Sequence, residues 1–149
     1  MARLDYAVSS DGTVDLDGLE PRLNQVLRGF LRRAKGVRGV VVVDAQGLPI
    51  SSEGARGLDL NVISAMSTLI TESATSVLQN LGITGPRLVL VEGDEANVAA
   101  VPIARGNASV LAVLQKDANL GLVRLEMQKA CYELADALAD VVDLFFRSV

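Results

Sequence analysis

Few side chains in this 149-residue chain are able to perform nucleophilic, acid–base or metal chemistry. Cys131 is the one cysteine, and histidine, the usual general base and the commonest metal ligand, does not occur. Cys131 lies within a predicted helix beside Ala130 and Leu134, whereas reactive cysteines need an exposed, electropositive setting. The run Gly93-Asp94-Glu95 has too few oxygen ligands for a calcium loop and is typical of a hairpin turn. The sequence therefore predicts a structural thiol, no metal site and no catalytic residue.

Motifs that bind phosphate are also missing from the sequence. Neither Gly-x-x-x-x-Gly-Lys-Ser/Thr nor Gly-x-Gly-x-x-Gly occurs, so we expect no nucleotide or other cofactor. Arg56 and Arg105 fall in predicted loops, where an arginine acting on a partner's nucleotide would lie. Loop arginines are common, and we do not assign them this role. Without a catalytic constellation, an enzyme is the last functional class that we consider.

Basic residues gather at the end of the first predicted helix, with no acidic residue among them. They are Arg28, Arg32, Arg33, Lys35 and Arg38. Positive charge is favourable at a helix C-terminus, which accounts for the cluster without any function. The alternative is a docking site for an acidic partner surface, formed by Arg28, Arg32, Arg33 and Arg38, whose binding would weaken with salt.

The last predicted helix carries a mostly acidic stripe with spacings of three and four residues. It consists of Glu126, Lys129, Glu133, Asp136, Asp140, Asp143 and Arg147. We interpret this stripe as a solvated helix face. If the first and last helices lie side by side, the basic and acidic groups also partly neutralise each other.

The composition indicates one domain with an aliphatic core. Half of the residues are apolar, only 3 % are aromatic, and tryptophan is absent. The formal net charge of −4 gives no general attraction to nucleic acid or to an anionic membrane. No apolar run approaches the roughly 20 residues that span a bilayer, and the single cysteine fits a reducing compartment. We therefore expect a cytoplasmic domain with no nucleic acid partner and no membrane insertion.

Hydrophobic periodicity predicts the elements that position these side chains. Residues 1–16 show no convincing period, so we expect a flexible N-terminal tail before a domain over residues 17–149. Helices are predicted over residues 19–34, 59–81 and 120–146, and strands over residues 39–43, 48–52, 87–92, 97–103 and 109–115. The order is α-β-β-α-β-β-β-α. Short turns between strands require antiparallel neighbours, and Pro49 favours an edge position for the second strand.

The helix over residues 59–81 begins at Asp59, a good N-cap, and has two distinct faces. The apolar face, which we expect to pack on the chain's own core, contains Val62, Met66, Leu69, Ile70, Val77 and Leu81. The opposite face is rich in small hydroxyl groups and contains Asn61, Ser64, Thr68, Glu72, Thr75 and Gln79. This face is depleted of charge, as interface cores are, and we expect a second protein to cover it. The alternative is a polar surface that merely lacks charge.

The predicted sheet provides a second reason to expect a partner. The first and last helices are able to share one face of a five-stranded sheet, which leaves the central helix alone on the other. A single helix does not cover such a face, so apolar sheet surface should stay open beside it. A second copy of the chain, packed helix against helix, would close this surface.

Two stretches carry a resemblance to a known family. GVRGVVVVDAQGLPISSEG, at residues 36–54, contains a strand-Asp-x-x-Gly-strand hairpin, and DANLGLVRLEMQKA, at residues 117–130, opens the last helix. With the order of elements, these stretches resemble the Roadblock/dynein light-chain family, and the bacterial MglB-type regulators of small GTPases in particular. The resemblance covers about residues 17–147. It implies an α+β three-layer, profilin-like sandwich with a five-stranded antiparallel sheet.

The resemblance also implies a homodimer that binds a Ras-like small GTPase and alters its nucleotide cycle without binding nucleotide itself. Dimerisation would use the central helix and the strand that follows it. The expected interface residues are Asn61, Ser64, Thr68, Thr71, Glu72, Thr75, Gln79, Arg87, Val89 and Val91. Two alternatives stay open: a nucleotide-independent adaptor for a motor, kinase or cytoskeletal partner, and a ligand-sensing domain with a pocket under the central helix.

Overall fold

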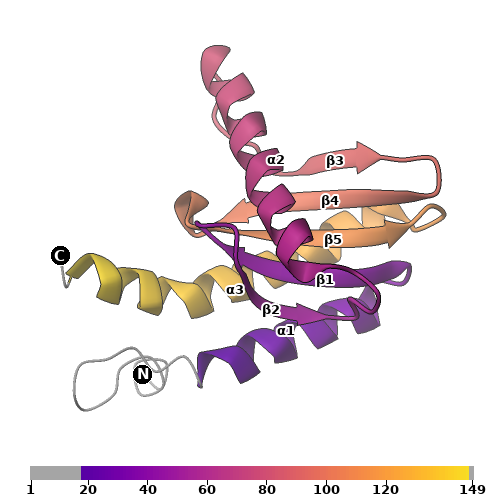
Figure 1. Ribbon diagram of the computed structural model, residues 1–149, viewed down its shortest axis with the longest axis horizontal. Helices are drawn as coiled ribbons and strands as arrows, with labels where there is room; N and C mark the ends of the chain where they lie inside the picture. Colours follow the sequence, from indigo (N-terminus) through magenta and orange to yellow (C-terminus); the bar gives the residue numbers. More distant parts are fainter. Residues whose placement is uncertain (1–17, 148–149) are drawn as a thin grey trace.

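The computed structural model describes residues 18–147, with side chains up to residue 139, so the predicted tail over residues 1–16 lies outside the described part. The described chain follows the order α-β-β-α-β-β-β-α (Figure 1). The helices are α1 (Leu19–Arg33), α2 (Leu60–Asn80) and α3 (Leu120–Arg147). The strands are β1 (Val37–Asp44), β2 (Pro49–Glu53), β3 (Val89–Glu92), β4 (Ala96–Ile103) and β5 (Ala108–Gln115). A 3-10 turn, η2 (Ala104–Gly106), joins β4 to β5.

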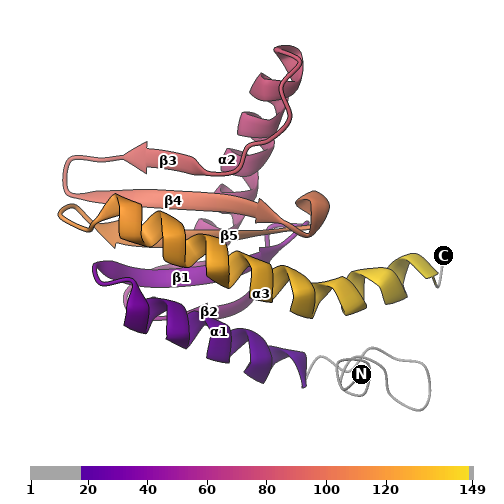
Figure 2. The same cartoon turned by 180° about the vertical axis from the view of Figure 1, so that it is seen from behind.

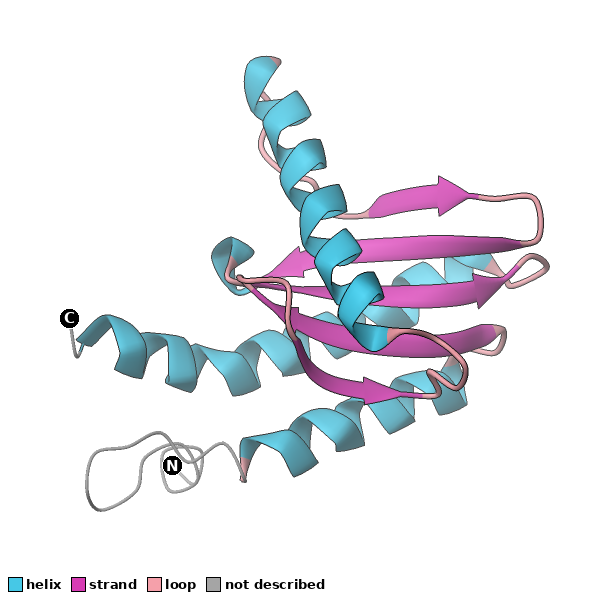
Figure 3. Ribbon diagram, in the orientation of Figure 1, coloured by secondary structure: helices cyan, strands magenta, loops and turns pink. Residues whose placement is uncertain are grey.

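The five strands form one antiparallel sheet in the order β2-β1-β5-β4-β3 (Figure 3). β2 begins at Pro49 and is an edge strand, which confirms the prediction made from that proline, because proline has no N–H to donate to a neighbouring strand. β3 forms the other edge, and Val91 lies opposite Val98 of β4. Both ends of the sheet therefore present a strand with only one neighbour.

Helices cover the two faces of the sheet unequally. α1 and α3 lie side by side on one face, and α2 crosses the other face alone (Figures 1 and 2). β1 is buried on both faces: Val40 and Val42 belong to the core beneath α1 and α3, while Val41 and Val43 face α2. The Asp59 carboxylate accepts a hydrogen bond from the Val62 N–H at 3.3 Å, which confirms the predicted cap of α2.

The predicted fold class is confirmed: three layers, a five-stranded antiparallel sheet and the expected order of elements. The element boundaries shift by at most two residues, for example at β3, which begins at Val89 rather than at Arg87. Strand ends are set by the pairing partner, which local hydrophobic periodicity does not contain.

Candidate interaction surfaces

The side of α2 that packs against the sheet is not the apolar side that we predicted, but one that carries Ser64, Ser67 and Thr71. Ser64 and Ser67 are fully buried and Thr71 is 6 % exposed, because the hydroxyl-rich side of the helix packs against the sheet. The Ser67 and Ser109 hydroxyl oxygens lie 2.9 Å apart, in hydrogen-bond contact across this packing surface. The expectation that Ser64 and Thr71 belong to the dimer interface is therefore wrong, because the chain's own sheet already covers both.

Small hydroxyl groups are able to face the sheet because the helix itself satisfies most of them. The Thr71 hydroxyl donates to the Ser67 carbonyl at 3.0 Å, and the Thr75 hydroxyl donates to the Thr71 carbonyl at 2.7 Å. Such bonds to the preceding turn leave no donor waiting for an outside acceptor. Small side chains also let the helix approach the strands closely. Ser64, which we assigned to a face covered by a partner, therefore packs on the chain's own sheet.

The apolar face of α2 points away from the sheet, so the prediction that it packs on the chain's own core is wrong. Five of its side chains, which we call the α2 apolar stripe, are between 45 % and 67 % exposed. They are Val62, Met66, Leu69, Val77 and Leu81. Ile70, the sixth predicted core residue, is half-buried at the edge of this face. Contiguous exposed apolar side chains of this size mark interaction sites.

The other predicted interface residues have mixed positions. Exposed side chains are Asn61, Glu72, Gln79, Arg87 and Val91, and half-buried ones are Thr68, Thr75 and Val89. Val91 is 46 % exposed and lies opposite Val98, which packs in the cluster beneath α2. The β3 edge therefore presents apolar surface on the same side as the α2 apolar stripe. The expectation that a single helix leaves part of this face open is confirmed at Val91.

The basic cluster divides into paired and unpaired residues. Arg28 pairs with Glu53 at 3.0 Å, and Arg33 pairs with Glu126 at 2.8 Å, which joins α1 to α3. The Arg33 hydrogen bond lowers the pKa of the Glu126 carboxyl below its ordinary value. Within the described residues, Arg32 and Arg38 are exposed and have no ion pair.

Charge neutralisation between α1 and α3 is thus confirmed, and a second ion pair, Arg22–Asp136 at 3.1 Å, adds to it. The side chains of Asp140, Asp143 and Arg147 lie outside the described part. Of the candidate docking residues, Arg32 and Arg38 remain available to an acidic partner.

Reactive groups are sparse in the described structure. Cys131 is buried, and burial raises the pKa of its thiol to about 12, so the thiol is un-ionised at neutral pH. Among the residues with described side chains, no group of His, Cys, Asp or Glu is arranged to hold a metal ion. No helix in the described part is long and apolar enough to cross a membrane. Where α2 meets β1 the free space is about 10 Å³, room for about one water molecule, so the described residues enclose no ligand-sized pocket at this place.

The architecture and its open surfaces define an α+β sandwich of the profilin-like class. The sequence pattern of the Roadblock/LC7 domain matches residues 23–115, and the chain belongs to this family. It is 30 % identical to an uncharacterised protein of Methanocaldococcus jannaschii over 100 residues, which are 67 % of this chain and 83 % of the relative.

Two solved structures place the fold among its neighbours. MglB of Myxococcus xanthus is similar with a TM-score of 0.74 and 20 % identity, over 81 % of this chain and 90 % of that one. Profilin II of Acanthamoeba castellanii is similar with a TM-score of 0.52 and 16 % identity, over 79 % of this chain and 97 % of that one. The family and the profilin-like fold expected from the sequence are confirmed.

Proposed function

We propose that the protein is a homodimeric, non-catalytic regulator in the cytoplasm that binds a Ras-like small GTPase and modulates its nucleotide cycle. Membership of the Roadblock/LC7 family and the resemblance to MglB-type regulators support the GTPase as partner. The exposed α2 apolar stripe is the observation that carries the proposal, because a protein with such a surface functions by association.

A second copy of the chain is the partner that suits the α2 apolar stripe. In a two-fold symmetric dimer the same patch meets itself, so an apolar patch is matched by an apolar patch. The β3 edge lies on the same side of the sheet and adds Val91 to the surface. The proposed interface therefore keeps Val89 and Val91 and replaces the hydroxyl face of α2 by its apolar stripe. It leaves out Arg87, which lies on the α3 side of the sheet.

The regulator would act by binding and not by supplying reactive groups. Histidine is absent from the sequence, and the buried Cys131 thiol is un-ionised at neutral pH. A partner shifts a conformational equilibrium only as far as its affinities for the two states differ. The protein would therefore bind one nucleotide state of the GTPase more tightly. Arg32 and Arg38 are the candidate contacts for an acidic surface on that GTPase.

The test is affinity capture from native lysate on the immobilised protein, in parallel with a non-hydrolysable GTP analogue and with GDP. The proposal predicts that a small GTPase is retained in one nucleotide condition only. Capture with the variant R32E/R38E should lose it, and the matched variant R105E, in the exposed turn η2, should retain it. Partners that are retained equally in both nucleotide conditions would establish the nucleotide-independent adaptor instead.

A further inference from the structure

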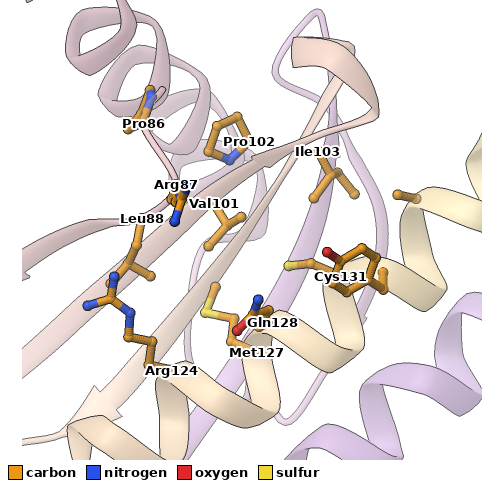
Figure 4. A pocket seen from close by; sticks show the side chains of 12 residues that line it. Pro86, Arg87, Leu88, Val101, Pro102, Ile103, Arg124, Met127, Gln128 and Cys131 are labelled. Atoms are coloured by element: carbon orange, nitrogen blue, oxygen red, sulfur yellow. The ribbon is translucent and has the colours of Figure 1, made fainter. Parts of the chain in front are cut away.

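An open groove of about 630 Å³ separates α3 from the β3–β4 side of the sheet (Figure 4). Its floor is apolar and contains Leu88, Val101, Ile103 and Met127. On this face of the sheet α1 lies over β1 and β2 and α3 contacts β4, so no helix of the described part lies over the β3 edge. The groove lies on the opposite side of the sheet from the α2 apolar stripe, so a dimer formed through α2 leaves it accessible.

The groove has a cationic rim over its apolar floor. Arg87, which precedes β3, and Arg124 on α3 belong to opposite walls. No acidic residue lines the groove, and neither guanidinium has an ion pair within the described residues. Tyr132, which also lines the groove, and Leu90 of β3 are exposed and add apolar surface. An occupant that fits this surface carries carboxylates together with apolar side chains.

We propose that this groove binds the N-terminal segment of the same chain, residues 4–11. Its sequence, LDYAVSSD, places apolar side chains at Leu4, Tyr6 and Val8, and carboxylates at Asp5 and Asp11. In an extended segment, alternate residues point the same way. Leu4, Tyr6 and Val8 would therefore lie on the apolar floor, and the two carboxylates would face Arg87 and Arg124 at the rim.

The chain is long enough for this segment to reach the groove. Arg22, in the first turn of α1, pairs with Asp136 at 3.1 Å, and Asp136 directly follows Ala135, which lines the end of the groove. Residues 12–18 span about 23 Å when extended at about 3.3 Å per residue. To reach the groove from the start of α1, the chain has to cross α3, and 23 Å is about twice the diameter of an α-helix, about 10–12 Å. Residues 4–11 span about 26 Å when extended, whereas the groove wall from Arg124 to Ala135 is about 17 Å long. The segment is therefore long enough to line the whole wall.

Cys131 provides the measurement, because it lines the groove and is the one cysteine of the chain. The rate at which an uncharged methanethiosulfonate reagent modifies this thiol reports how often the groove is open. An attached segment has an effective concentration of about millimolar. With a dissociation constant of about 0.1–1 mM, removal of its charges in the full-length variant D5N/D11N should speed modification roughly two- to tenfold. The matched variant D94N/E95Q removes two carboxylates from the β3–β4 turn and should leave the rate unchanged.

A double-mutant cycle shows whether the segment and the two arginines act on each other. The variant R87E/R124E should speed modification by about the same factor as D5N/D11N. In the combined variant the two factors should not multiply, because both changes release the same contact. Multiplying factors, or an unchanged rate in D5N/D11N, would overturn the proposal. Protection of the thiol that rises with protein concentration would also overturn it, since a second molecule would then occupy the groove.

Discussion

Leu69 lies in the middle of the α2 apolar stripe, and its replacement by arginine tests the proposed dimer. Full burial of a leucine side chain is worth about 1.5–3 kcal/mol. Leu69 is 54 % exposed in the single chain, so a partner is able to bury the other half of the side chain. This burial contributes about half of the full value, about 1 kcal/mol per chain. A symmetric dimer contains the substitution twice and loses about 2 kcal/mol, a roughly 30-fold rise in the dissociation constant. The two arginines that the substitution brings into one interface weaken the dimer further by repulsion.

The assay is multi-angle light scattering after size-exclusion chromatography, over a range of protein concentrations. The wild-type protein should have the mass of a dimer, and L69R should shift to monomer. The far-UV circular dichroism of L69R should match that of the wild type, since Leu69 contributes little to the monomer core, and its melting temperature should fall only by what dimerisation contributes. Q79R introduces the same charge at an exposed position of α2 outside the apolar stripe, and should remain dimeric. A dimeric L69R at all concentrations, or equal dissociation by Q79R, would refute the reasoning.

Three further predictions concern stability. The pKa of Glu126 is lowered in the folded state, so the stability that its ionised carboxylate contributes is present at neutral pH and is lost as the pH falls through that lowered value. In urea unfolding, E126Q should therefore lose less stability on acidification than the wild-type protein does. Within the described part of the chain, the buried Ser64 hydroxyl has no hydrogen-bond partner, so S64A should preserve stability or raise it by up to about 1 kcal/mol in urea unfolding. S67A leaves the Ser109 hydroxyl unpaired and should cost about 1–3 kcal/mol in the same assay. A Cβ at Gly39 would meet the Ala55 Cα at 3.1 Å, so G39A should force the β2–α2 loop outward and lower the melting temperature. An unchanged melting temperature would show that this loop moves at no cost.

Local patterns were sufficient for the fold because each element has its own signal. The valine run of β1 predicts a strand buried on both faces, Pro49 predicts an edge, and Asp59 predicts a helix start. These signals involve neighbouring residues only. They were therefore readable without knowledge of the tertiary contacts.

The orientation of α2 was not predictable from the same kind of pattern. Periodicity divides a helix into two faces but does not say which face meets the chain's own sheet. The rule that apolar faces pack inward fails here because Ser67 bonds to Ser109, and Thr71 bonds to its own helix, so these two hydroxyl groups are buried at little cost. The groove beside Arg124 was missed for a different reason. Its walls come from segments far apart in the sequence, and no local motif joins them.

The proposed function requires that the protein distinguishes the two nucleotide states of a small GTPase. The most direct measurement is a pair of dissociation constants for the captured, purified GTPase, loaded with a non-hydrolysable GTP analogue or with GDP. A regulator that shifts the nucleotide cycle needs a difference in affinity, and we expect at least about tenfold, equivalent to about 1.4 kcal/mol. Equal dissociation constants for the two states would contradict the claim and leave the protein as an adaptor.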